Sequence, residues 1–406
     1  MDLSSLRKRV DLEEFIENVR PIVEDVRKNG DKAVIKYEKL FDNVELKRLR
    51  VRKKEIDDAY DEVEDELIDA LEIAKENIER FHMLTSVERE IKIRFEDCLM
   101  GKIYTPLERV GAYIPGGRAS YPSTALMTGI PARIAGVEKL IACTPPNSEG
   151  KVNPLTLVAC DIAGFDEIYS IGGAQAIAAM AYGTESVPAV QKIVGPGNAY
   201  VTAAKMLVSK DVAIDMPAGP SEILVIADDS ANPEFIAYDC LAQLEHDPLA
   251  IAVVLTTSER IADEVRKIVY GKLSEPNLAL ELVRDIDEAI KIANEFAPEH
   301  LAIFCRNAEK YLEKVKNAGS VFIGDFSGVA MGDYAAGTNH VLPTSGYAKI
   351  YSGLTVESFM KSITFQQLTP ETIKRLGNAV ARLAEAEGLK YHAESIKIRL
   401  DHSKNS

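Results

Sequence analysis

Apolar side chains in the first hundred residues recur at spacings of three and four, the period of a helix with one buried face. One such stripe begins after Asp11, a candidate N-cap, and ends at Gly30. Pro21 stands inside this stripe and predicts a kink or the start of a new helix. A second stripe, from Ile56 to Phe81, predicts a single longer helix. The N-terminal region is therefore expected to be helical.

From about residue 107 the pattern changes to short apolar runs that are bounded by Gly or Pro and alternate with helical stretches. The first series of runs covers residues 109–114, 139–143, 167–171, 192–194, 212–214 and 222–227, and the second covers 251–256, 280–283, 300–304 and 320–323. Such alternation is typical of repeated βα units on a mainly parallel sheet. We therefore expect an α/β fold: two Rossmann-like α/β domains with mainly parallel sheets, a helical N-terminal region and a small helical C-terminal tail.

The same pattern suggests three regions. We expect residues 1–105 and 229–355 to form the first α/β domain, which includes the helical N-terminus, and residues 106–228 to form the second. Residues 356–406 are expected to be a helical tail that has little core of its own and docks on another surface as a dimerisation element. Residues 324–355 are rich in Gly, Ser, Thr and Asn, and so long a segment without periodicity is usually functional.

Composition narrows the class of protein. The 406 residues carry a formal net charge of −15, which argues against a nucleic-acid partner because phosphate binding needs a basic field. The apolar runs are too short to cross a membrane, and the N-terminal residues lack the apolar core of a secretory signal. Five cysteines without a CxxC pair are typical of reduced thiols. These features predict a cytoplasmic protein with no nucleic-acid or membrane partner.

Three Gly-rich turns, at Ile114–Ser120, Ile171–Ala176 and Val194–Tyr200, follow predicted strands and open predicted helices. Gly lets a backbone approach a ligand, and a helix N-terminus offers unpaired N–H groups to phosphate. The third turn resembles the start of a dinucleotide fingerprint, but Tyr200 stands where the third Gly belongs. Each turn alone is compatible with an ordinary βα connection, whereas together they favour a nucleotide site. Its polar side chains would be Tyr113, Gln175 and Asn198.

A candidate metal site combines residues from three distant segments. Gln243 and His246 are three apart on one predicted helix face, a spacing that suits two ligands and equally suits an ordinary helix-end histidine. Residues 324–355, here called the polar segment, add Asp333 and His340. The tail, residues 356–406, adds Glu387 and His392. Nitrogen and oxygen ligands of this kind fit zinc or another borderline divalent metal, although spacing alone leaves the site open. His82 and His402, in charged helical surroundings, are expected at the surface.

Two chemistries compete for the catalytic step. Glu299 and His300 are adjacent at the start of an apolar strand, where a carboxylate can tune a histidine that titrates near neutral pH. The alternative is an NAD-dependent aldehyde dehydrogenase in which Cys143 or Cys305, each at a strand end, is the nucleophile. Only Arg306 stands beside either thiol to lower its pKa, so we favour structural roles for all five cysteines. A metal- or nucleotide-binding protein without catalysis is the third reading.

The motifs, in their order along the chain, resemble those of the histidinol dehydrogenase family. The matching segments are GAYIPGGRASYPSTALM, IGGAQAIAAMAYGT, VGPGNAYVTAAKMLV, DMPAGPSEILVIAD, AQLEHDP, APEHL, GDYAAGTNHVLPT and EGLKYH, and the likeness runs from about residue 10 to 400. The resemblance implies oxidation of L-histidinol to L-histidine, through L-histidinaldehyde, with two NAD⁺. This chemistry belongs to the last steps of histidine biosynthesis.

The resemblance also implies a role for each candidate residue. One zinc ion per subunit would be held by Gln243, His246, Asp333 and His392. L-Histidinol would contact these four residues together with Ser221, His300, His340 and Glu387. NAD would contact Tyr113, Gln175 and Asn198, and Glu299 and His300 would be the catalytic acid/base pair. Finally, the family is a homodimer in which the tail, with its Glu387 and His392, completes the site of the other subunit.

Overall fold

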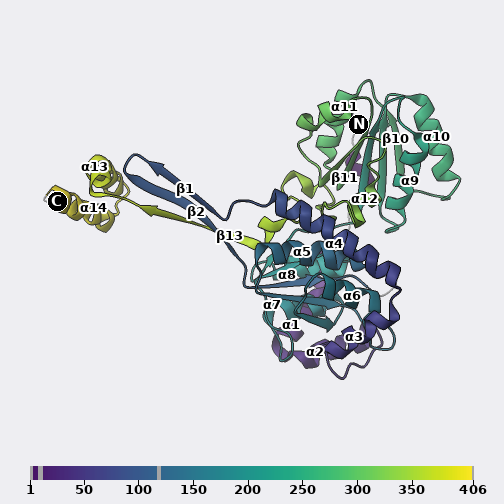
Figure 1. Cartoon of the computed structure of the whole chain (residues 1–406), viewed down its shortest axis with the longest axis horizontal. Coiled ribbons are helices and arrows are strands. Elements are labelled where there is room, and N and C mark those ends of the chain that lie inside the picture. The colour runs from purple at the N-terminus through teal and green to yellow at the C-terminus, as the bar shows by residue number, and fades with distance from the viewer. Residues whose placement is uncertain (1–2, 8–11, 117–119, 405–406) are drawn as a thin grey trace. The chain divides into compact units, whose positions relative to one another are not determined.

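A computed structural model describes residues 3–7, 12–116 and 120–404 (Figure 1). The chain divides into two compact units, one of residues 1–86 and 107–359, the other of residues 87–106 and 360–406. The predicted N-cap Asp11 and part of the first Gly-rich turn lie outside the described residues. Among the residues that the structure describes, none of the helices is long and apolar enough to cross a membrane.

The first unit contains two five-stranded parallel sheets, which confirms the predicted pair of Rossmann-like α/β domains. The first sheet has the order β5-β4-β3-β6-β7 and the second the order β10-β9-β8-β11-β12. Both follow the same path: the first strand along the chain is central, the next two lie on one side and the last two on the other. The topological switch points therefore fall between β3 and β6 and between β8 and β11.

The first sheet consists of β3 (Arg109–Tyr113), β4 (Lys139–Thr144), β5 (Glu167–Ser170), β6 (Lys192–Val194) and β7 (Ala213–Ile214). Its helices are α5 (Pro122–Ala135), α6 (Pro154–Ile162), α7 (Gly173–Tyr182) and α8 (Ala199–Val208). The second sheet consists of β8 (Glu222–Ala227), β9 (Ile251–Thr256), β10 (Leu278–Leu282), β11 (His300–Phe304) and β12 (Ser320–Ile323). Its helices are α9 (Pro233–Leu244), α10 (Glu259–Tyr270), α11 (Ile286–Phe296) and α12 (Val329–Tyr334), and the short 3₁₀ turns are η1 (Leu3–Leu6), η2 (Ala308–Lys314), η3 (Tyr347–Lys349) and η4 (Val356–Phe359).

Strands that are buried on both faces explain why the second sheet reads as continuous apolar runs. In β8, Ile223 and Val225 face a core that includes residues of α9 and α10, whereas Leu224 and Ile226 face a core that includes residues of α11. Successive side chains of a strand point to opposite faces, so each face of the sheet needs its own helices. Since β8 pairs with β9 and β11, the domain boundary expected at residue 228 falls too late.

The long N-terminal helices cover the first sheet, whereas Leu3 of η1 packs in a core of the second sheet. The expected grouping of residues 1–105 with 229–355 is therefore corrected from residue 12 onward. Helices α1 (Leu12–Asn29) and α2 (Asp31–Phe41) contact α7 and α8, and Val19 of α1 shares a core with Ala203 of α8. Pro21 stands inside α1, which continues through it. The single helix expected from residue 56 to 81 is two, α3 (Lys53–Glu62) and α4 (Asp65–Thr85), because Val63 between them is extended. On α4, the predicted surface residue His82 is buried.

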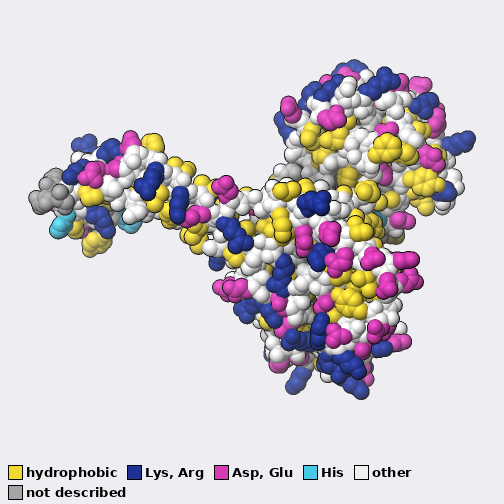
Figure 2. Space-filling view, in the orientation of Figure 1, with side chains coloured by type: hydrophobic (Ala, Val, Ile, Leu, Met, Phe, Trp, Pro, Cys, Tyr) yellow, Lys and Arg dark blue, Asp and Glu magenta, His cyan; other side chains and the backbone are white. Residues whose placement is uncertain are grey.

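The second unit is not the purely helical tail expected from residue 356. Strands β1 (Glu90–Phe95), β2 (Cys98–Pro106) and β13 (Met360–Gln367) form an antiparallel sheet, and α13 (Pro370–Ala386) and α14 (Lys390–Lys404) follow. Thr369 and Thr372 donate hydrogen bonds to Asp97, which ties the start of α13 to the turn between β1 and β2. Figure 2 shows hydrophobic side chains at the surface of this unit, and those exposed include Ile91, Ile93, Phe95, Ile363 and Leu383.

A buried ion pair fixes the turn after β6. Lys205 Nζ and Asp215 Oδ1 are in contact, with both side chains almost fully buried. Gly195 lies between them: its N–H donates to Asp215 Oδ2 at 2.7 Å, and its carbonyl accepts from Lys205 Nζ at 2.9 Å. Gly195 has a φ of +106°, and a Cβ there would lie 2.2 Å from the carbonyl oxygen of Tyr113. Lys205 and Asp215 therefore hold the backbone at position 195 in a conformation that only glycine readily adopts.

Replacing Lys205 by Met is expected to lower the free energy of unfolding by about 3–5 kcal/mol, because Asp215 would remain buried without a partner. Denaturant unfolding measures this loss. Lys210→Met, at an exposed position just past α8, is the matched control and should change stability by less than about 0.5 kcal/mol. Equal, small losses in the two variants would contradict the role of the pair.

Candidate functional site

The predicted site residues lie at opposite edges of the two sheets. Tyr113 ends β3, Gln175 lies in the first turn of α7 after β5, and Asn198 caps α8 after β6, all at the carboxyl edge of the first sheet. Ligands of open α/β sheets usually bind at that edge, near the switch point. In the second sheet, by contrast, Ser221 precedes β8 and His300 opens β11, at the amino edge.

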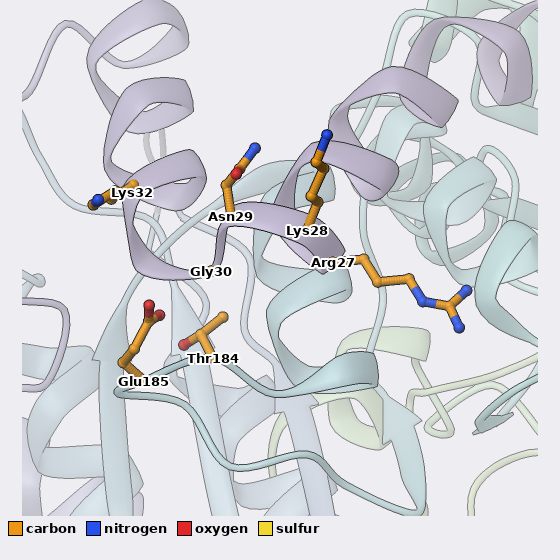
Figure 3. A pocket seen from close by; sticks show the side chains of 7 residues that line it. All are labelled: Arg27, Lys28, Asn29, Gly30, Lys32, Thr184 and Glu185. Atoms are coloured by element: carbon orange, nitrogen blue, oxygen red, sulfur yellow. The ribbon is translucent and has the colours of Figure 1, made fainter.

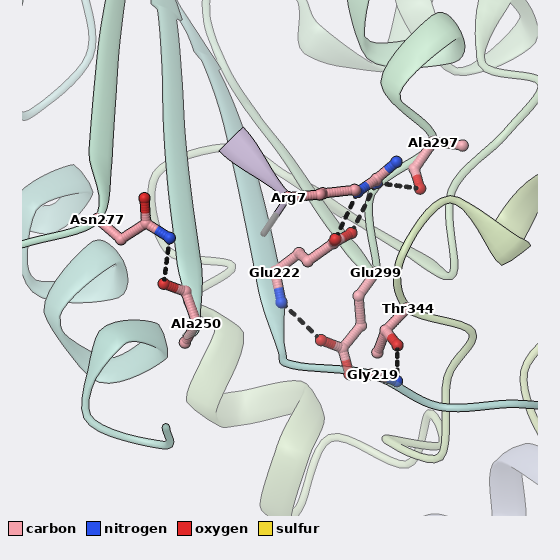
Figure 4. Close-up of polar contacts among 8 residues, drawn as sticks. All are labelled: Arg7, Gly219, Glu222, Ala250, Asn277, Ala297, Glu299 and Thr344. Atoms are coloured by element: carbon pink, nitrogen blue, oxygen red, sulfur yellow. Dashed lines mark hydrogen bonds and ion pairs between the residues drawn. The ribbon is translucent and has the colours of Figure 1, made fainter. Parts of the chain in front are cut away.

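Glu299 and His300 form a buried pair next to Asp333. His300 Nδ1 lies 3.8 Å from Glu299 Oε2, and His300 Nε2 lies 3.3 Å from Asp333 Oδ1. Neither ring nitrogen makes a hydrogen bond of good geometry. Glu299 Oε2 accepts a hydrogen bond of 2.9 Å from the backbone N–H of Glu222 (Figure 4). One carboxylate oxygen is thereby anchored to the first residue of β8, beside the imidazole.

Burial and charge place the pKa values of this pair in the working range of an acid/base catalyst. Burial raises the pKa of Glu299 to about 7. Burial lowers the pKa of His300, but Glu299 and Asp333 together outweigh it and raise the value to about 9. For Asp333, burial opposes and the contact with His300 favours the charged form, so its pKa lies below the usual range. The pKa of Glu299 thus lies near neutral pH, whereas the two carboxylates make the imidazole of His300 more basic than a free one.

The polar segment brings the second sheet to a helix of the first. His340 Nδ1 donates a hydrogen bond of 2.7 Å to the carbonyl of Asp333, and its Nε2 lies 3.3 Å from Thr124 Oγ1 on α5. Because a carbonyl only accepts, Nε2 is the acceptor for the threonine hydroxyl. Asn339 Nδ2 donates 2.7 Å to the carbonyl of Met127 one turn further along α5. The predicted substrate residue His340 thus lies where the two domains meet, beside Asp333.

Three of the four predicted zinc ligands lie on neighbouring elements of the first unit. Gln243 is buried in the last turn of α9, His246 is exposed just past its end, and Asp333 lies on α12, which contacts α9. His246 is near enough to Asp333 to lower the pKa of its carboxyl. Within the described ranges, no group of three or more His, Cys, Asp or Glu side chains is already gathered as a metal site. An amide oxygen, an imidazole and a carboxylate nevertheless suit zinc.

The remaining two predicted residues belong to the second unit. Glu387 is the C-cap of α13 and His392 lies in the first turn of α14, and both are exposed. They are therefore outside the set that the first unit brings together. Gly388 has a φ of +77°, which turns the chain between the two helices that carry them.

Each predicted cofactor residue makes a hydrogen bond at or near a Gly-rich turn. The hydroxyl of Tyr113 accepts a hydrogen bond of 3.2 Å from the N–H of Gly173, and Gln175 Nε2 donates 2.8 Å to Glu38 Oε1. Asn198 Oδ1 accepts from the N–H of Val201 at 3.1 Å and so caps α8. Tyr113 and Gln175 are buried, whereas Asn198 is exposed.

Three residues near these sites escaped the sequence analysis. Asp239 of α9 has a carboxylate oxygen without a hydrogen bond, and burial raises its pKa to about 6. Its position four residues before Gln243 places it on the same helix face, a spacing that could have identified it. Arg7 pairs with Glu222 at 2.6 and 2.8 Å and donates to the carbonyl of Ala297 (Figure 4). Glu38 of α2 accepts hydrogen bonds from the turn that opens α7. No local sequence pattern predicts the contacts of Arg7 or Glu38, because their partners are more than 130 residues away in the chain.

The cysteines do not provide a nucleophile. Cys143 is fully buried in β4, and burial raises the pKa of its thiol. Cys305 is half-buried, and burial raises its pKa to about 11. A thiol attacks as the thiolate, which neither residue forms near neutral pH. Cys160 and Cys240 are buried packing residues of α6 and α9, as predicted.

An open surface hollow lies away from all of these residues. It has a volume of about 570 Å³ and lies where α1 ends and α2 begins (Figure 3). Its lining residues are Arg27, Lys28, Asn29, Gly30, Lys32, Thr184 and Glu185. The Glu185 carboxylate accepts a hydrogen bond from the N–H of Asp31 at 2.8 Å, so this chain already supplies an anion at the start of α2.

Comparisons with known proteins agree with the geometry. The family model described as histidinol dehydrogenase matches residues 5–400. A histidinol dehydrogenase of Archaeoglobus fulgidus is 67% identical over 98% of this chain and 99% of its own, and one of Methanocaldococcus jannaschii is 48% identical over 97% and 94%. The crystal structure of histidinol dehydrogenase from Elizabethkingia anophelis covers 98% of this chain and 94% of its own, with 43% identity and a TM-score of 0.93.

The match in sequence and in fold extends over nearly the whole length of this chain and of these proteins. The competing cysteine-nucleophile chemistry has no thiolate to support it. The chain therefore belongs to the histidinol dehydrogenase family and is an oxidoreductase of that type.

Proposed function

We propose that this protein oxidises L-histidinol to L-histidine, through L-histidinaldehyde, with two NAD⁺. The observation that carries the proposal is the buried Glu299–His300 pair beside Asp333, which places an imidazole 3.8 Å from one carboxylate and 3.3 Å from another. Family membership supplies the substrate class. In the cell, the reaction would take place in the cytoplasm as the last part of histidine biosynthesis.

In the first half of the reaction, the imidazole of His300 accepts the hydroxyl proton of the alcohol as a hydride leaves the same carbon. A positioned acid/base group of this kind contributes about 10²–10⁴ in rate. Glu299, held by the N–H of Glu222, lies 3.8 Å from Nδ1 and stabilises the positive charge that the imidazole gains. NAD, when bound, accepts the hydride.

The second half begins with water. The aldehyde has no hydrogen that can leave as hydride together with a hydroxyl proton until it is hydrated to a gem-diol. Glu299 accepts a proton from the attacking water while His300 returns its first proton to the carbonyl oxygen, which gives the gem-diol. The imidazole, neutral again, then accepts a hydroxyl proton of the diol as the second hydride leaves. The two neighbouring bases serve different steps: His300 accepts protons from hydroxyl groups when a hydride leaves, and Glu299 accepts a proton from water during hydration.

The zinc ligands of the proposal are Gln243, His246, Asp333 and His392. Zinc, when bound, would hold the imidazole and amine of the substrate. The half-buried carboxylate of Asp333 and the exposed imidazole of His246 supply the charge and the softer nitrogen that such a site needs. Ser221, His340 and Glu387 would complete the substrate site, and a pocket that matches the polar groups of a substrate strongly rejects analogues that lack them.

Tyr113, Gln175 and Asn198 would contact NAD at the carboxyl edge of the first sheet. The proposal includes a homodimer in which the second unit carries Glu387 and His392 into the site of the other subunit. Two observations support it: both residues are exposed, and apolar side chains such as Ile93, Phe95 and Leu383 are exposed on the same unit.

The stoichiometry of the reaction tests the proposed function. The purified protein with zinc is expected to release two NADH for each L-histidinol consumed, because alcohol and aldehyde are both oxidised at one site. Absorbance of NADH against residual substrate measures the ratio, and a chelator should abolish the reaction until zinc is restored. One NADH per substrate, or none from folded, zinc-loaded protein, would refute it.

Substitution of the catalytic pair separates the two bases. His300→Asn is expected to lower kcat by about 10²–10⁴ while L-histidinol still binds, since the proton acceptor is lost and the fold is not. Glu299→Gln should slow oxidation of supplied L-histidinaldehyde at least as much as oxidation of the alcohol. The controls are the exposed His402→Asn and Glu309→Gln. Wild-type turnover in His300→Asn would remove this residue from the mechanism.

The metal assignment predicts that His246→Asn loses zinc after dialysis, because the imidazole is the only nitrogen ligand that the first unit provides. Elemental analysis of the purified variant measures the zinc content, independently of activity. His402→Asn, which changes an exposed histidine outside the proposed ligands, should keep the wild-type content. Stoichiometric zinc in both variants would show that His246 is not a ligand.

A further inference from the structure

A carboxyl group from the N-terminal helices lies directly under the predicted cofactor residue Gln175. Glu38 of α2 is fully buried. Its Oε1 accepts two hydrogen bonds, one of 2.9 Å from the N–H of Gly172 and one of 2.8 Å from Gln175 Nε2. These partners are 134 and 137 residues away in the sequence, in the turn that opens α7. The contact is therefore a tertiary one, made by the packing of α2 on α7.

The other buried residues of α2 are not ionised, and the exposed Asp42 is the nearby second acid. Ala33, Val34 and Tyr37 occupy the same buried face of α2, so Glu38 is a single acid among core residues. A buried carboxyl costs free energy unless it is hydrogen-bonded, and only its Oε1 is. Burial, with a smaller contribution from Asp42, raises the pKa of Glu38 to about 7. A residue this costly in a core is more readily explained by a function than by packing.

The bond from Gln175 fixes which end of its amide is available. Only the amino end of an amide can donate to a carboxylate, so Nε2 faces Glu38 and the carbonyl Oε1 is left. That oxygen is buried and makes no hydrogen bond. The N–H groups of Gly172 and Gly173 are not free to bind a phosphate. The first donates to Glu38 and the second to the hydroxyl of Tyr113. This corrects the expectation that the turn cradles phosphate.

We propose that Glu38 is a positioning residue of the cofactor site: it holds the Gln175 side chain so that its carbonyl oxygen accepts a hydrogen bond from a hydroxyl group of the dinucleotide. The inference rests on the proposed function, since it assigns the contact to NAD. Glu38 itself touches no substrate and acts only through Gln175 and the turn at Gly172.

Binding of NADH to the whole purified protein, followed by fluorescence titration, tests the inference without turnover. Glu38→Met keeps the length of the side chain but removes the acceptor, and is expected to weaken NADH binding by at least about tenfold, the equivalent of one lost hydrogen bond to a charged group. Glu38→Gln, whose Oε1 can accept both bonds, should stay within about threefold of wild type. In both variants the KM for L-histidinol should change by less than about twofold, since the substrate does not contact this turn.

A double-mutant cycle separates positioning from a merely structural role. In a Gln175→Met background, adding Glu38→Met should weaken NADH binding little further, because its effect passes through Gln175. Thermal unfolding checks that each variant is folded. If Glu38→Met does not fold, Glu38→Thr removes the same acceptor but keeps a polar group on α2.

The outcomes distinguish a failure of the NAD assignment from a failure of the role of Glu38. Wild-type protein that binds no NADH would overturn both the cofactor assignment and this inference. Wild-type protein that binds NADH, with a folded Glu38→Met variant that binds it equally well, would overturn the inference alone. Additive losses in the cycle, or an equal rise in the KM for both substrates, would also overturn it, since they mark a general loss of structure.

Discussion

The hydrogen bonds between the polar segment and α5 are the contacts on which the geometry of the site depends. Asn339 binds the carbonyl of Met127, and His340 lies between Thr124 and the carbonyl of Asp333. Through them the α12 segment of the second sheet is held against the helix that follows β3 of the first. Asn77 of α4 adds a third contact by donating to the carbonyl of Ala335, so residues 335–340 are held by two helices of the domain built on the first sheet.

The two sheets have the same strand order, but their candidate site residues lie at opposite edges. The first follows the usual rule, with its Gly-rich turns at the carboxyl edge beside the β3–β6 switch point. In the second sheet, the carboxyl edge at the β8–β11 switch point is closed by Asp228, which accepts from the N–H of Arg306 and the hydroxyl of Ser230. The proposed catalytic pair, Glu299 and His300, lies at its amino edge instead. Strand order alone would therefore place the proposed site at the opposite end of this sheet.

Sequence periodicity predicted both parallel sheets, because strands buried on both faces leave long apolar runs such as Ile223–Val225. It assigned the first helices to the wrong sheet. An amphipathic stripe such as that of Val19 indicates that one helix face is buried, but it does not indicate which sheet covers that face. It missed β1 and β2, whose alternating Ile91, Ile93 and Phe95 were taken into a helical region. Side chains with recognisable motifs were identified, whereas Glu38 and Arg7 act across the fold and have no local signature.

The antiparallel sheet of the second unit joins segments that are made at very different times. Strand β2 ends at Pro106 and pairs with β13, which begins at Met360, so its partner emerges from the ribosome roughly 250 residues and about 10–50 s later, at about 5–20 residues per second. Throughout that interval the β1–β2 hairpin presents an unpaired edge and the apolar side chains of Ile91 and Ile93. Nascent chains of this protein consequently carry a hairpin whose β2 edge stays unpaired until β13 has been made, and a ribosome that stalls within β11 or α12 leaves that edge open to pairing with other chains.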